Sequence, residues 1–462
     1  MIGGSWSPQG VILFGSTDRA ILRVSANGGT AVPATKLEPT EAFHTQPFFL
    51  PDGHHFLYTR ISPSGGGVYI GSLDAKPEDQ SAQRLLTAQF AIYAPGRPSG
   101  PGYVIFLRDS SLMAQPFDAG RLELQGDAIP VADPVGLYAT RGLFSASASG
   151  VLAYQGGSGA SGIRLAWYDR QGKLLGEAAP PASYRAPEIS PDGGRLALRR
   201  LDPQTGNSDI WLIDLIRGGN TRFTSDPAVD GAPVWFPDGS RIVFASNRAG
   251  HFDLYVRPTN QSRPEEVLLR SGEDKTAQSI SPDGRYVMYS ANDVKTGRDL
   301  WYVPLSGNVP GAGTPSLFLQ TEFRESEAQF SPDGRWVAYS SDATNRSEIY
   351  VRPFPPPKEG GAQLMVSNGG GIQPRWNHNG KEILYLSGRK VMSVEVTSNA
   401  EFHAGVPKVL FEAPVLSVLG VINEYDWAVT SDGKRFLINS EPVGHEAVPI
   451  MVVLNWTEGL RK

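Results

Sequence analysis

The chain has 462 residues, which is enough for two to four ordinary domains and too long for one small core. Apolar residues make up 40% of it and charged residues 19%, a balance typical of a globular protein and not of a disordered one. The net charge of −5, with no block of lysine and arginine, argues against binding to nucleic acid or anionic lipid. Because the chain has no cysteine, disulfides, thiolate metal sites and cysteine nucleophiles are excluded.

Glycine and proline indicate an all-β fold. The 52 glycines and 37 prolines would be costly inside helices but are useful in turns. No window has sustained helical periodicity, and none approaches the roughly 18 apolar residues of a membrane span. Residues 1–6 lack the basic and apolar segments of a signal peptide. The sequence as written predicts a cytoplasmic chain, and an extracytoplasmic one if an upstream export segment belongs to it.

A short phrase, Ser-Pro-Asp-Gly followed by a strand, recurs about ten times along the chain, at spacings of roughly 43 to 53 residues. Proline presets the second position of a tight turn, aspartate accepts hydrogen bonds from nearby backbone, and glycine takes the positive φ that closes the turn. The repeated aspartates are therefore interpreted as turn residues and not as an array of binding carboxylates. The clearest copies are Leu50–Gly53, Ser190–Gly193, Phe236–Gly239, Ser281–Gly284 and Ser331–Gly334.

Each copy lies in a unit of four short predicted strands. The first strand ends at the turn, the second alternates apolar and polar residues, the third begins with an acidic residue before an aromatic strand, and the fourth is short and apolar. Four strands at this spacing are typical of a β-propeller blade. Examples of the predicted third strand begin at Asp209, Asp253, Asp299 and Glu348.

Phrases such as Ser281–Val287 and Asp209–Trp211 resemble the TolB-type, WD-repeat-like β-propellers of bacteria. The segments 107–118, 323–339 and 452–457 also resemble the propeller region that many bacterial serine/threonine protein kinases carry C-terminally. This resemblance implies a sensor or scaffold that binds other proteins. The kinase domain itself is absent, because the sequence has no glycine-rich loop with its lysine strand, no His-Arg-Asp loop and no Asp-Phe-Gly motif.

The sequence predicts two groups of blades, residues 1–180 and 181–462. The first group begins in the middle of a blade and is expected to be an incomplete four-blade propeller part. The second is expected to be a six-bladed TolB-like propeller. Its last blade takes its first three strands from 425–430, 435–439 and 450–455, and its outermost strand from 173–177. The alternative is one ring of eight to ten blades.

A search for catalytic motifs finds none. The Gly-x-Ser-x-Gly elbow of serine hydrolases does not occur, and no pair of the seven histidines has the spacing of a metal site. We therefore predict no catalytic residue, no cofactor and no metal. The alternative is a propeller hydrolase or lyase whose site is built from channel loops.

The loops that lead into the first strand of each blade, on the rim opposite the repeated turns, vary in sequence and carry charge. Loops around a propeller channel are where partners bind, so this rim is predicted to bind a protein or peptide. The alternative is solvated loop charge without a ligand. The predicted function is thus a non-enzymatic scaffold or sensor. The candidate partner-binding residues are Asp230, Glu273, Asp274, Lys275, Arg324, Glu325 and Glu327.

Overall fold

The fold is all β in a computed structural model, apart from two short 3₁₀ helices, Pro77–Asp79 (η1) and Trp456–Leu460 (η2). The residues that it describes are 3–15, 20–38, 41, 43–61, 66–88, 90–96, 100–108, 110–138, 141–147, 149–156, 164–202, 207–293, 296–305, 313–357, 363–398, 401–413, 415, 424–440 and 449–460. In this part of the chain no helix is long and apolar enough to cross a membrane.

The chain forms two compact units. Unit 1 comprises Met1–Gly162 and Gly444–Lys462, and unit 2 comprises Ile163–Val443. This division differs from the predicted ranges 1–180 and 181–462, because the end of the chain returns to unit 1 and residues 164–177 belong to the last sheet of unit 2.

Unit 2 contains six antiparallel sheets in its described residues, and each runs from an inner strand to an outer one. The first two are β20 (Tyr184–Ile189), β21 (Arg195–Leu201), β22 (Ser208–Asp214), β23 (Asn220–Arg222), and β24 (Asp230–Trp235), β25 (Arg241–Ser246), β26 (Asp253–Pro258), β27 (Glu266–Leu269). The third and fourth are β28 (Lys275–Ile280), β29 (Tyr286–Asp293), β30 (Gly297–Pro304), β31 (Ser316–Leu319), and β32 (Glu325–Phe330), β33 (Trp336–Ser341), β34 (Glu348–Pro353), β35 (Leu364–Met365). The fifth is β36 (Ile372–Trp376), β37 (Glu382–Ser387) and β38 (Lys390–Ser398), with β39 (Phe402–Ala404) and β40 (Lys408–Glu412) both paired to β38.

The sixth sheet joins strands from both ends of unit 2. Its order is β41 (Trp427–Val429), β42 (Arg435–Ser440), β18 (Arg164–Asp169) and β19 (Leu174–Glu177). The predicted outermost strand at 173–177 is confirmed as β19. The predicted third strand at 450–455 was wrong, because β18 holds that place and pairs with β42 from Arg164 opposite Ser440 to Asp169 opposite Arg435. A tight turn at Asp169–Gly172 connects β18 directly to β19, so the two enter the sheet as one hairpin.

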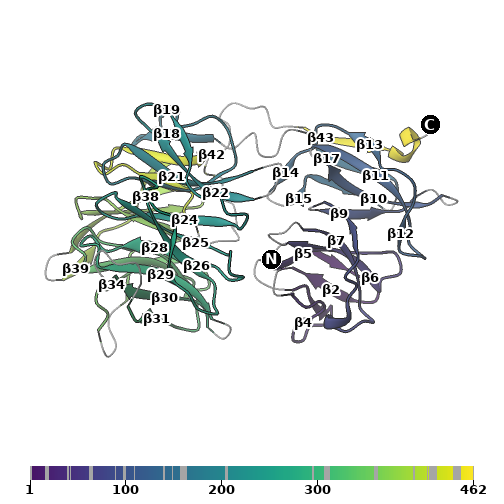
Figure 1. Cartoon of the computed structure of the whole chain (residues 1–462), viewed down its shortest axis with the longest axis horizontal. Helices are drawn as coiled ribbons and strands as arrows, with labels where there is room; N and C mark the ends of the chain where they lie inside the picture. The colour runs from purple at the N-terminus through teal and green to yellow at the C-terminus, as the bar shows by residue number, and fades with distance from the viewer. Residues whose placement is uncertain are drawn as a thin grey trace. The chain divides into compact units, whose positions relative to one another are not determined.

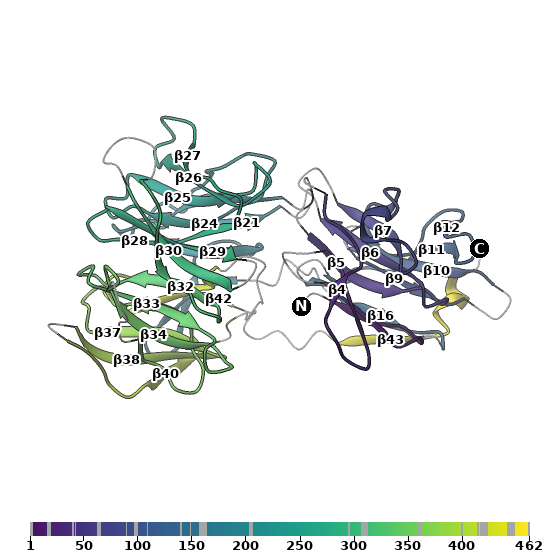
Figure 2. The same ribbon diagram turned by 90° about the horizontal axis from the view of Figure 1, so that it is seen from below.

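Hydrophobic clusters connect the six sheets of unit 2 in a cycle. Each cluster draws buried side chains from two successive sheets, and the last one joins the sixth sheet to the first. Figure 2 shows the sheets from β24 to β40 following one another in chain order. Such a cycle of four-stranded sheets is the arrangement of a β-propeller. Pairs that share a cluster, in order round the cycle, are Ile210 and Phe244, Val256 and Val287, Phe318 and Tyr339, Val351 and Ile383, Phe411 and Phe436, and Leu437 and Leu198.

Unit 1 repeats this pattern without a described closing cluster. Its first two sheets are β1 (Gly4–Trp6), β2 (Val11–Phe14), β3 (Leu22–Ser25), β4 (Val32–Pro33), and β5 (Phe43–Phe49), β6 (His55–Ile61), β7 (Gly67–Ser72), β8 (Arg84–Leu86). The third contains β9 (Ala91–Ala94), β10 (Gly102–Arg108), β11 (Ser111–Asp118), β12 (Glu123–Leu124) and β13 (Ile129–Ala132), and a small pair follows, β14 (Leu137–Tyr138) and β15 (Arg141–Gly142). The last is β16 (Phe144–Ala146), β17 (Val151–Gln155) and β43 (Ile450–Leu454). In Figure 1 the C-terminal strand β43 lies beside β17, while β42 lies near β18.

Candidate functional site

The six inner strands of unit 2 all run into the repeated turn. In each turn the fourth residue, a glycine with φ between 67° and 72°, donates its N–H to the carbonyl of the first, as from Gly193 to Ser190 at 2.8 Å and from Gly433 to Thr430 at 2.8 Å. The aspartates cap these turns. Asp192 accepts hydrogen bonds from the Ser190 hydroxyl and the Gly194 N–H, and these bonds lower its pKa. These contacts support the interpretation of the aspartates as structural.

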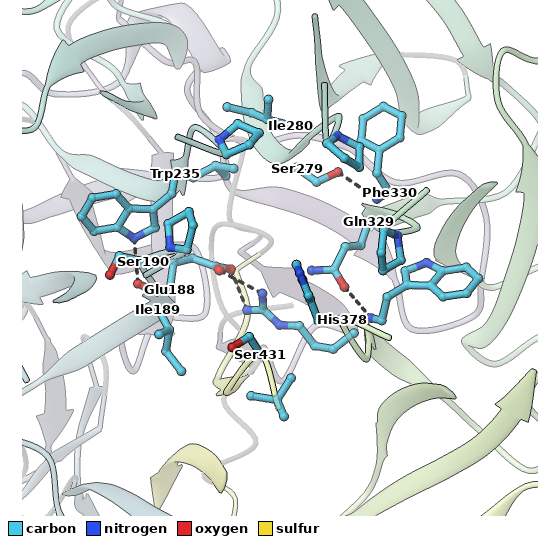
Figure 3. Close-up of a pocket in the computed structure, with 18 of the residues that line it drawn as sticks. Glu188, Ile189, Ser190, Trp235, Ser279, Ile280, Gln329, Phe330, His378 and Ser431 are labelled. Carbon is cyan, nitrogen blue, oxygen red and sulfur yellow. Dashed lines mark hydrogen bonds and ion pairs between the residues drawn. The ribbon is translucent and has the colours of Figure 1, made fainter. Parts of the chain in front are cut away.

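The turns surround the mouth of a cavity of about 500 Å³. All six inner strands contribute residues at or just before their turns (Figure 3). Because the strands carry the same turn, they present equivalent positions to one space, and the side chains at these positions set its character. The residues two positions before the first residue of each turn are Glu188, Val234, Ser279, Gln329, Arg375 and Ala428, and all of them except Ala428 line the cavity.

An ion pair crosses this cavity. Both terminal nitrogens of Arg375, in β36, donate hydrogen bonds to the Glu188 carboxylate oxygens, in β20, at 2.6 and 2.9 Å (Figure 3). The two strands belong to the fifth and first sheets. The guanidinium also donates to the Trp427 carbonyl at 2.9 Å and lies 4.0 Å from the centre of the Tyr425 ring. A bidentate pair of this kind fixes both side chains and leaves the cavity wall without net charge from them.

The remaining lining mixes aromatic and amide groups. Trp235 donates its indole N–H to the Glu188 carbonyl at 2.9 Å, and Gln329 accepts the backbone N–H of Trp376 at 2.7 Å. Phe330 and His378 also line the space (Figure 3). A concave space of this volume with a few fixed polar groups is of the kind in which ligands bind.

A second layer of polar groups lies two residues further from the turns. Glu327 accepts the backbone N–H of Gln373 at 2.6 Å and the Ser340 hydroxyl at 2.8 Å, and burial raises its pKa. Gln373 in turn donates to Asp426 at 3.2 Å. Burial raises the pKa of Asp426 to about 6, although Arg185 lies 3.4 Å away and lowers it. This network ties three inner strands together.

The structure gives most of the predicted partner-binding residues partners inside unit 2. Lys275 is buried and donates to Asp253 at 3.1 Å and to the Glu273 carbonyl at 2.7 Å. Asp230, also buried, lies 3.1 Å from Arg248, and burial raises its pKa to about 6.

Glu325 and Glu327 are likewise buried. Glu325 accepts hydrogen bonds from Thr321 and Ser341, and burial raises its pKa to about 7. Asp274 accepts the Phe252 N–H at 2.8 Å, whereas Glu273 and Arg324 have exposed side chains. A binding role for these seven residues stays a prediction.

The cavity lining was not predicted, because the repeated turns were assigned to the fold alone. The available signal was the variation two residues before each turn, where Glu188, Gln329 and Arg375 stand among otherwise similar strands. Among the described residues, no group of three or more His, Asp or Glu side chains is placed to hold a metal ion.

Comparison with known proteins finds that part of the chain is similar to one kind of propeller. Residues 173–307 match the PD40 family, described as a TolB beta propeller domain. The Tol-Pal system protein TolB of Wolinella succinogenes is 31% identical over 108 residues, 23% of this chain and 25% of that protein. The TolB of Helicobacter pylori is 27% identical over 105 residues, 23% and 24% of the two chains. The match thus spans about a quarter of these relatives.

Among solved structures, TolB from Acinetobacter baumannii is similar at 14% identity and a TM-score of 0.40, over 76% of this chain and 79% of that one. The family match and the TolB relatives show a TolB-like propeller fold in the part of the chain that they cover. The predicted all-β propeller class and the resemblance to TolB-type propellers are confirmed. The resemblance to kinase-associated propellers stays a prediction.

Proposed function

We propose that this chain is a non-enzymatic scaffold whose unit 2, a six-bladed propeller, binds a segment of a partner protein at the turn-lined cavity. The observation that carries the proposal is the convergence of six inner strands on one space of about 500 Å³. TolB-like propellers are protein-interaction scaffolds, and the TolB relatives are named as parts of the Tol-Pal system. A protein partner is therefore the class that the relatives favour for this chain.

The lining suits an uncharged segment with apolar side chains. The Glu188–Arg375 pair satisfies its own charges, so it leaves no single charge to recruit an ion. The partly exposed apolar side chains of Ile189, Val234 and Val429 line the cavity, as do exposed prolines at its turns, and they offer apolar contact. The prolines are Pro191, Pro237 and Pro282. The predicted binding loops at the other ends of the inner strands would then serve mainly to hold the blades together.

The test uses a library of random peptides displayed on phage and selected against the immobilised full chain. Ser431 stands in the last turn, is exposed and lines the cavity (Figure 3), so Ser431→Trp should fill the mouth without disturbing the core. Ser262→Trp, at an exposed loop position outside the cavity, is the matched control.

We expect selected peptides to lose at least about tenfold in affinity with Ser431→Trp and to bind Ser262→Trp unchanged. Peptides that bind all three proteins equally would contradict the cavity as the binding site. A parallel selection against Arg324→Glu tests the exposed loop charge at the opposite ends of the strands, where no loss is expected.

A further inference from the structure

The strand β43 stands in an unusual place for this chain. In the complete four-stranded sheets, the third strand pairs with a fourth. Strand β43 is the third strand of its sheet. Among the described residues, no strand pairs with its other edge. All five of its residues, Ile-Met-Val-Val-Leu, are apolar. Three of them have side chains that are 68%, 59% and 70% exposed, namely Ile450, Val452 and Leu454.

The backbone of these same three residues points away from β17. The carbonyls of Gln155 and Val151 accept hydrogen bonds from Gly136 and Ser147, so both are directed away from β43. Because backbone groups alternate along a strand, Ala153 is directed the same way. The residues opposite these three are Ile450, Val452 and Leu454, whose N–H and C=O groups therefore face the outer edge.

Other edge strands in the described chain are protected by the means that proteins commonly use. Most outer strands carry charge, as with Arg222 in β23, Glu266 in β27 and Lys408 in β40, or contain only two or three residues. Two longer outer strands are uncharged: β31 has two of its four residues buried, and β13 contains Pro130, which cannot donate a hydrogen bond to a further strand. A long, uncharged and exposed edge such as β43 is a template for another strand.

We infer that β43 is a homodimer interface, pairing antiparallel with β43 of a second copy of this chain about a two-fold axis at Val452. In this register Val452 lies opposite Val452 of the second copy, and Ile450 lies opposite its Leu454. The outward backbone groups are arranged symmetrically about Val452, so each opposed pair exchanges two hydrogen bonds. No charge is brought opposite a like charge, and the three exposed apolar side chains of each copy meet on one face of the joined sheet.

This self-complementarity indicates that the strand beside β43 comes from a second copy of the chain. A strand of another protein would need a matching run of apolar residues, whereas a second copy supplies one with the right length, direction and lack of charge. The interface lies on unit 1 and involves none of the cavity residues of unit 2, so its test is independent of the proposed peptide site.

The experiment is sedimentation equilibrium on the full chain over a wide concentration range, in which the natural protein should approach twice its 49.9 kDa mass. Val452→Lys and Val452→Glu each place like charges opposite one another and should weaken dimerisation at least tenfold. An equimolar mixture of the two variants should restore the dimer, because the opposed charges are then complementary. Leu317→Lys, on the uncharged edge of β31, is the matched control and should leave the dimer intact.

Circular dichroism melts of each variant show whether it is folded, and the mixing experiment succeeds only if both variants are. A natural chain that stays monomeric at every concentration would overturn the proposal. So would a dimer that both Val452 variants form unchanged, or one that the mixture of folded variants fails to restore.

Discussion

Units 1 and 2 are built from the same kind of four-stranded sheet, but they differ in whether a described hydrophobic cluster joins the last sheet to the first. In unit 2 the first and sixth sheets share a cluster that includes Leu198 and Leu437. In unit 1 three clusters connect four successive sheets, and no described cluster joins the last of them to the first. In unit 2 the sheet that completes the cycle is built from both ends of the unit, because β18 pairs with β42.

The largest expected effect tests whether each unit has its own core. Trp427 is fully buried in the cluster between the fifth and sixth sheets of unit 2, and Leu152 is fully buried in unit 1. Trp427→Ala should lower the free energy of unfolding of unit 2 by about 3–5 kcal/mol, and Leu152→Ala that of unit 1 by about 2–5 kcal/mol. Urea unfolding followed by hydrogen exchange within each unit would measure this. Equal loss of protection in both units for either variant would contradict separate cores.

The next effect concerns the ion pair across the ring of unit 2. Arg375→Met should destabilise unit 2 by roughly 3 kcal/mol, because it leaves Glu188 without its partner in a largely buried place. The double variant Glu188→Gln with Arg375→Met should recover much of that loss, since no unpaired charge remains. Urea midpoints of the natural chain, the single variants Arg375→Met and Glu188→Gln, and the double variant give the coupling energy. Strict additivity of the two single changes would show that the pair does not connect the first and fifth sheets.

A pH dependence should appear in unit 2 through Asp426. Burial raises its pKa in the folded chain from 3.8 to about 6. Between about pH 4 and pH 6 the folded state therefore binds more protons than the unfolded state, and the stability that this group contributes is present below pH 4 and is lost as the pH rises through 6. Asp426→Asn should thus become more stable relative to the natural chain by roughly 1–3 kcal/mol between pH 4 and pH 7. Urea unfolding at a series of pH values would measure it, and a constant difference across this range would be evidence against the raised pKa.

The smallest effect should be the same in both units. Asp333 and Asp52 cap equivalent turns: Asp333 accepts the backbone N–H of Arg335, and Asp52 accepts those of His54 and His55. Asp333→Ala and Asp52→Ala should each cost about 1 kcal/mol in the unit that holds the turn, because one capping carboxylate is removed from an exposed site. Thermal unfolding would compare them. A loss several times larger in one unit would indicate that its turn does more than close a hairpin.

The fold could be predicted from the sequence because its repeated turn is local. Ser-Pro-Asp-Gly closes a hairpin by its own backbone preferences, so each blade is visible wherever the phrase occurs. Strand partners that lie far apart in the sequence were harder to predict. Ile450–Leu454 and Arg164–Asp169 both have the apolar character of a third strand, and only the structure shows that the second of these pairs with β42.

The site was less accessible to prediction for a related reason. Charge in a loop does not reveal whether the side chain faces solvent, and Lys275 and Glu325 are buried against partners that come from other strands or loops. The cavity residues depend on the convergence of six strands, and no single strand contains that information.

The closure of unit 2 can be measured with engineered cysteines, since the natural chain has none. One double variant places cysteines at Asp169 and Arg435, opposite each other on β18 and β42; a second places them at Val151 and Leu454, opposite each other on β17 and β43. Opposed positions of this kind lie within the range that a disulfide can span. Mapping of the cross-linked peptides after mild oxidation should show an intramolecular disulfide in both double variants. A third double variant places cysteines at Arg435 on β42 and Leu454 on β43. Absence of a disulfide in the first variant together with a disulfide in the third would contradict closure of unit 2 by its own two ends.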